Sequence, residues 1–272
     1  MWVAAVDTTD TRGPGRLAPG GPVAWACLLV LVTVTVHPSR ASAQTNLQLW
    51  GNLTLDKVKS ERLVYELDLE PKVLLKAPEG EPAWRNLDVT PNVEYSPKGW
   101  VDLVAEATVG VTRQTDEVDT FEVTPRVGAR FHVFSRAMRT FGALEAPPRR
   151  RVVVRDLFRV ESRNFFYFNE GSGSSSTVRF RNRIEFRVPL NTEKLTDDRA
   201  RYLLADWEWF MPVSEPDERF ANKQRIRTGI GYRRSFAWRF EALYMWTRSR
   251  NTIEEGFKTD DNIIDIRVKR VF

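Results

Sequence analysis

The chain has 272 residues, of which 28% are charged, and 41 lysines and arginines against 36 aspartates and glutamates give a formal net charge of +5. Positive and negative residues are intermixed along the chain, so nucleic-acid binding is not expected. A single cysteine, Cys27, excludes a framework of disulfides within the chain.

The first segment has the features of a secretory signal peptide. Residues 22–36 form an apolar run that is too short for a comfortable membrane helix. Ala41 and Ala43 follow it at the −3 and −1 positions of a cleavage site before Gln44. We therefore expect a signal peptide over 1–43 and one exported domain over 44–272. Acidic residues near the N-terminus leave a start codon further along the chain as an alternative.

Nearly everything after Gln44 alternates between charged and apolar residues, which is the period of a β-strand. The alternation predicts eleven strands: 45–56, 62–75, 86–96, 100–114, 120–134, 151–167, 177–190, 201–214, 221–234, 237–250 and 261–272. Most are longer than the five or six residues usual in soluble sheets. They match strands that cross a bilayer at a tilt, for which about 9–11 residues are needed.

Residues 177–190 raise the question of which face of the strands meets the interior. Four arginines and Glu185 occupy one face, whereas Phe180 and Ile184 belong to the other. A secreted soluble barrel or sandwich would place the apolar face inside. A membrane barrel would place it against lipid, with the arginines in the lumen.

The end of the chain favours the membrane barrel. Ile264, Ile266 and Val268 alternate with charged residues before the terminal Phe272. This ending resembles the assembly signal of bacterial outer-membrane barrels, from which Arg270 departs.

Aromatic residues and connections also favour the membrane barrel. Trp238 and Trp246 are eight residues apart on one predicted strand, which corresponds to roughly 20 Å across a membrane and to two interfacial girdles. Residues 96–99 and 233–236 suit tight hairpins, and the Gly/Ser-rich residues 169–176 suit a flexible loop tip.

We therefore predict an all-β protein, a transmembrane antiparallel up-and-down β-barrel with a charged lumen. Eleven strands conflict with the even number usual for bacterial barrels. We expect about twelve, with a twelfth strand in 135–150. Ten strands are the alternative, if 45–56 lies outside the wall.

Several segments resemble a known family. The stretches LQLWGNLTL (47–55), RFRNRIEFR (179–187), DWEWF (206–210) and QRIRTGIGYR (224–233), with the barrel-type ending, resemble the domain-of-unknown-function family 2490 of outer-membrane barrels. The resemblance implies a porin-like β-barrel in the outer membrane of a Gram-negative bacterium. It implies no established substrate and no catalytic residues.

Strand parity predicts two walls of opposite charge inside the barrel. The basic wall consists of Arg126, Arg130, Arg155, Arg159, Arg163, Arg179, Arg181, Arg183, Arg187, Arg225 and Arg227. The acidic wall consists of Glu66, Asp68, Glu70, Asp88, Glu94, Asp102 and Glu106. Such a transverse field orients dipolar solutes, and an excess of arginine attracts anions.

Two functions fit these walls, and the sequence leaves both open. One is a narrow pore with a slight anion preference, for a solute that the sequence does not identify. The other is a structural or binding barrel whose lumen is closed by its own ion pairs. The expected partners are outer-membrane lipid, the barrel assembly machinery and, for a pore, small solutes.

Enzymatic activity is not expected. A lipid-active enzyme of the outer membrane needs a nucleophile and a base, and His132 is the one histidine after the predicted signal peptide. No serine pairs convincingly with it, so we interpret His132 as a hydrogen-bonded lumen residue. One histidine and no cysteine in the exported chain also make a metal site unexpected, and no cofactor is expected.

Overall fold

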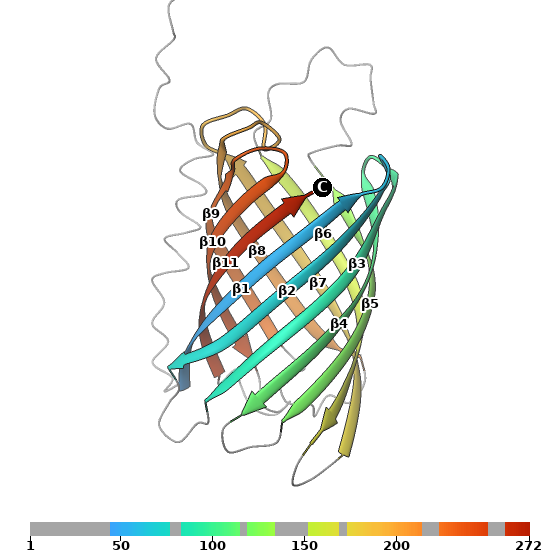
Figure 1. Ribbon diagram of the computed structural model, residues 1–272, viewed down its shortest axis with the longest axis vertical. Helices are drawn as coiled ribbons and strands as arrows, with labels where there is room; N and C mark the ends of the chain where they lie inside the picture. Colours follow the sequence, from blue (N-terminus) through green and yellow to red (C-terminus); the bar gives the residue numbers. More distant parts are fainter. Residues whose placement is uncertain are drawn as a thin grey trace, which may run out of the picture. The chain divides into compact units, whose positions relative to one another are not determined.

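The computed structural model describes residues 44–76, 83–114, 119–133, 152–168, 173–213, 223–249 and 259–272. Among these residues eleven β-strands close a barrel (Figure 1). The strands are β1 (Gln44–Val58), β2 (Leu63–Lys76), β3 (Trp84–Lys98), β4 (Val101–Gln114), β5 (Thr120–His132), β6 (Val153–Tyr167), β7 (Gly173–Pro189), β8 (Ala200–Pro212), β9 (Lys223–Arg233), β10 (Trp238–Ser249) and β11 (Thr259–Val271).

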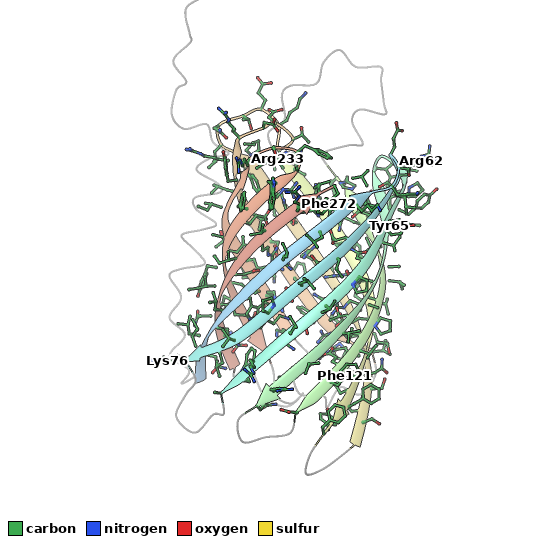
Figure 2. All side chains as sticks on the ribbon, in the orientation of Figure 1. Arg62, Tyr65, Lys76, Phe121, Arg233 and Phe272 are labelled. Atoms are coloured by element: carbon green, nitrogen blue, oxygen red, sulfur yellow. The ribbon has the colours of Figure 1, made fainter. Side chains whose placement is uncertain are left out.

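Successive strands pair in an antiparallel manner from β1–β2 to β10–β11, and the barrel closes through a parallel pair between β1 and β11. Figure 1 shows these two strands side by side, running toward the same end. Arg62, Arg233 and Phe272 lie at that end, and Lys76 lies at the other (Figure 2). Closure removes the free strand edges that would otherwise pair with other chains.

The expected count of twelve strands, or ten, is wrong. Residues 45–56 belong to the wall as part of β1, so the ten-strand alternative fails. Residues 135–150 lie outside the described residues, but β5 and β6 on either side of them pair directly. With an odd number of strands the first and last run in the same direction. A parallel ladder from Gln44↔Thr259 to Asp56↔Val271 then closes the barrel.

One predicted loop is partly a strand. Residues 169–176 were expected to form a flexible tip, but β7 begins at Gly173. The residues from Gly173 to Ser176 pair in register with the end of β6, from Tyr167 to Asn164. The neighbouring strand supplies backbone partners, and these outweigh the low strand propensity of glycine and serine. Residues 169–172 are outside the described part of the chain.

The apolar side chains of the strands point outward and the charged ones point inward. Val127 on β5 is 62% exposed and Ile230 on β9 is 61% exposed, whereas Glu161 and Glu208 are fully buried inside. This arrangement is the reverse of a soluble barrel, in which the apolar face forms the core. No helix of the described residues has the length and hydropathy to cross a membrane.

One contact inside the barrel requires a glycine. Gly231 on β9 is in register with Tyr202 on β8, and a Cβ at Gly231 would lie 2.1 Å from the Tyr202 ring. The ring therefore packs directly over the glycine backbone. Its hydroxyl donates a hydrogen bond to Glu241, at 2.5 Å, which fixes a large side chain across the inner wall.

Candidate functional site

The interior contains a cavity of about 930 Å³. It is lined by successive inward positions of β3, namely Trp84, Asn86, Asp88, Thr90, Asn92 and Glu94. At about 3.3 Å per residue and a tilt near 40°, this run covers roughly 25 Å along the barrel axis.

Basic side chains dominate the surface of the cavity. Sixteen lysines and arginines line it, against ten aspartates and glutamates. All eleven arginines of the predicted basic wall lie among the lining residues, and so do six residues of the predicted acidic wall. The structure therefore brings the two walls together around one space.

Asp102 is the member of the predicted acidic wall that does not line the cavity. It is 1% exposed, accepts a hydrogen bond from Ser96 Oγ at 2.6 Å and contacts the imidazole of His132. The carboxylate thus lies between the hydroxyl and the imidazole. In a nucleophilic triad the imidazole occupies the middle position, whereas here the carboxylate separates Ser96 from His132.

Glu161 accepts hydrogen bonds from several guanidinium groups behind the cavity surface. It is fully buried and accepts hydrogen bonds from Arg126 Nε at 3.0 Å and Arg181 Nη1 at 2.8 Å. Arg179 also donates to it. Three cations on two strands, β5 and β7, therefore share this one carboxylate of β6.

Glu208 on β8 has a similar role. It is also fully buried and accepts from Arg159 Nη2 at 2.9 Å, Arg181 Nη2 at 2.8 Å and Arg225 Nη1 at 3.3 Å. Neither Glu161 nor Glu208 lines the cavity, whereas their arginine partners do. Because these two carboxylates lie behind the cavity surface, that surface carries more net positive charge than a count of all inward-facing residues would give.

The acidic wall is partly neutralised by lysines. Lys72 Nζ lies 2.7 Å from Glu70 and 2.5 Å from Asp88. Lys269 on β11 similarly bridges Asp56 and Glu66, each at 2.7 Å. Arginine also reaches this side, because Arg130 pairs with Glu94.

Apolar residues inside the barrel were missed by the sequence analysis. Trp50, Met245 and Ile263 form a buried cluster. Lys72 Nζ lies 4.4 Å from the centroid of the Trp50 ring, and the guanidinium carbon of Arg225 lies 5.4 Å from it. The sequence could have predicted the inward position of Trp50, because it lies two residues from Gln48 and therefore on the same face of β1.

A second apolar cluster lies inside the barrel beside β8 and β10. It consists of Tyr202, Leu204 and Leu243, and none of these side chains lines the cavity. These side chains fill part of the interior beside β8 and β10, whereas the cavity is lined by residues of all eleven strands. Further charged lining residues, outside the two predicted walls, are Lys72, Glu122, Glu185, Lys223, Arg239, Glu241, Asp261, Arg267 and Lys269.

The predicted assembly signal lies on the outer face of β11. Ile264, Ile266 and Phe272 are 43%, 45% and 64% exposed. Arg270, which departs from the usual pattern, stacks over the rings of Trp238 at 4.5 Å and Phe272 at 5.0 Å. A cation on this face is thus covered by aromatic side chains.

Within the described ranges, no group of three or more His, Cys, Asp or Glu residues is placed to hold a metal ion. The fold and the interior together define a closed eleven-stranded β-barrel with a salt-bridged, largely basic cavity. The chain belongs to the family described as "Protein of unknown function (DUF2490)", which matches residues 47–257. This match confirms the family resemblance seen in the sequence. No curated protein and no solved structure matches the chain.

Proposed function

We propose that the protein is an outer-membrane barrel of a Gram-negative bacterium that forms a narrow path for small solutes, with a preference for anions. The exposed apolar outer face supports a membrane location. Trp238 and Trp246 near the two ends of β10 add the spacing expected of interfacial aromatics. Export by a signal peptide over 1–43 and recognition of the last strand by the barrel assembly machinery belong to the same proposal.

The observation that carries the transport function is the cavity itself. It follows β3 for a length close to the apolar thickness of a membrane barrel. Sixteen basic side chains face it, while Glu161 and Glu208 are recessed behind their arginine partners. A passage with guanidinium groups at its surface attracts anions and repels cations.

The test is single-channel recording of the purified barrel in a planar bilayer under a KCl gradient. We expect small conductance steps and a reversal potential on the side of chloride. Arg155→Gln, inside the cavity, should move the reversal potential toward cations. Arg62→Gln, in the exposed turn after β1, is the matched control and should not. A folded barrel that never conducts would contradict the proposal.

The alternative is a closed structural barrel. Its support is the part of the interior that is filled by Tyr202, Leu204 and Leu243. In that case liposomes containing the barrel should resist swelling in small sugars and in small salts alike. Neither function requires a catalytic residue, and we propose that the protein is not an enzyme.

A further inference from the structure

Arg183 differs from the other arginines of β7. It lines the cavity, with Leu157 on β6 and Glu208 on β8 as its register partners. In the part of the chain that the structure describes, Arg183 takes part in no ion pair, and its Nε has no hydrogen-bond acceptor. It is therefore a cavity-facing guanidinium without a carboxylate of its own.

The reason is that the carboxylates near Arg183 are already occupied. Glu185 accepts from Arg187 Nε at 3.0 Å, and Asp206 accepts from Arg227 Nε at 2.7 Å. Glu208 accepts hydrogen bonds from Arg159, Arg181 and Arg225. Competition among guanidinium groups for few carboxylates thus leaves Arg183 without an ion pair.

The surroundings of Arg183 favour an added anion. Arg159 Nη2 and Arg227 Nη2 lie 2.9 Å and 3.7 Å from Glu208, the register partner of Arg183, so positive charge gathers around this position. The distance of 3.7 Å is too long for a hydrogen bond, so the buried Nη2 of Arg227 is left without a hydrogen-bond acceptor. Buried donors without acceptors carry a desolvation cost, which an anion with several acceptor oxygens would relieve.

We propose that Arg183, together with Nη2 of Arg227, forms a binding site for a small oxyanion of the size of phosphate. A guanidinium presents a planar fork of donors that matches two oxygens of such an anion, which a spherical halide does not offer. The inference deepens the proposed pore and rests on it in one respect, because the anion reaches the site through the cavity.

The first experiment measures equilibrium binding of inorganic phosphate to the folded barrel in detergent, by equilibrium dialysis at fixed ionic strength. Arg183→Gln should weaken binding by roughly tenfold or more, the value of a lost charge-assisted hydrogen bond. Arg183→Lys keeps the charge but not the fork, and should bind with intermediate affinity. Because Arg183 has no carboxylate to leave unpaired, both variants should fold.

The matched control is Lys223→Gln. Lys223 lines the same cavity from the start of β9, so the exchange removes a basic side chain that is not part of the proposed site. Phosphate binding should weaken clearly less than in Arg183→Gln, because Lys223 donates no hydrogen bond to the proposed site. Wild-type affinity in Arg183→Gln, or an equal loss in Lys223→Gln, would overturn the site.

A second arm separates this inference from the pore. Phosphate should reduce chloride current through the wild-type barrel and not through Arg183→Gln. A barrel that conducts but binds no phosphate refutes the oxyanion site and leaves the pore. A barrel that binds phosphate through Arg183 but never conducts supports the site and refutes the pore.

Discussion

At the scale of single residues, the interior is organised by buried carboxylates that each serve several arginines. Glu161 is the clearest example, since it is fully buried and contacts Arg126, Arg179 and Arg181. A buried charge without its partner is strongly destabilising, whereas an intact pair contributes little net stability. Glu161 therefore matters mainly because three cations depend on it.

We predict that Glu161→Gln lowers the free energy of unfolding by roughly 3–5 kcal/mol, since it leaves three guanidinium groups without their shared counter-charge. Urea titration of the barrel in lipid vesicles measures the change. Glu61→Gln is the control, because Glu61 is exposed in the turn between β1 and β2, and should change stability by less than about 0.5 kcal/mol. Equal effects of the two variants would contradict this role for Glu161.

At this scale the sequence predicted which side chains share a face, but not which of them pair. Parity alone placed the arginines of the basic wall inward. Pairing depends on the depth of each residue in the barrel and on competition for carboxylates. Arg159 reaches Glu106, two strands away, at 2.7 Å, whereas Arg183 on the strand beside it pairs with none. Such outcomes require the register of all strands at once.

At the scale of elements, the strands were predictable and their closure was not. Charged and apolar alternation located all eleven strands to within a few residues, apart from the early start of β7 at Gly173. The parallel pairing of β1 and β11 left no local signal, because a strand has the same alternation whichever direction its neighbour runs. The expectation of an even number of strands came from the general rule for bacterial barrels, not from the residues of this chain.

The closure is testable by cysteine pairs on the outer face. Leu53 on β1 lies in register with Val268 on β11 and with Leu69 on β2. We predict that Leu53→Cys with Val268→Cys forms a disulfide, since neighbouring strands are about 4.8 Å apart. Electrophoresis without reductant detects it as a shift in mobility. The predicted signal peptide carries the chain's one cysteine, so the exported barrel should contain only the introduced pair.

Leu69→Cys with Val268→Cys serves as the control for this pair. These residues flank Leu53 on opposite sides, about 9.6 Å apart, which is too far for a disulfide. In a ten-strand barrel β2 and β11 would be neighbours, and this second pair would cross-link instead of the first. The two pairs thus report opposite results for the two closures.

At the scale of the whole molecule, the outer wall of the barrel is an exposed apolar surface, and its stability depends on whether water or lipid surrounds it. Val127 on β5 is exposed, and its register partners Ala105 and Val160 are apolar as well. In water such a surface would be a contiguous apolar patch of the kind that drives association. In lipid it is the expected outer face of a membrane barrel.

Arginine substitutions at two depths separate these environments. Val127 lies near the middle of β5, whereas Leu190, also exposed, follows the end of β7. If hydrocarbon surrounds the wall, Val127→Arg should lower the free energy of unfolding in lipid vesicles by about 2–4 kcal/mol, and Leu190→Arg by about 0–1 kcal/mol. If water surrounds it, both exchanges should stay within about 0.5 kcal/mol of the wild type, as for exposed positions of soluble proteins. A penalty of this size that depends on depth is expected where the dielectric changes along the barrel axis, so equal small effects would refute the membrane location and the pore with it.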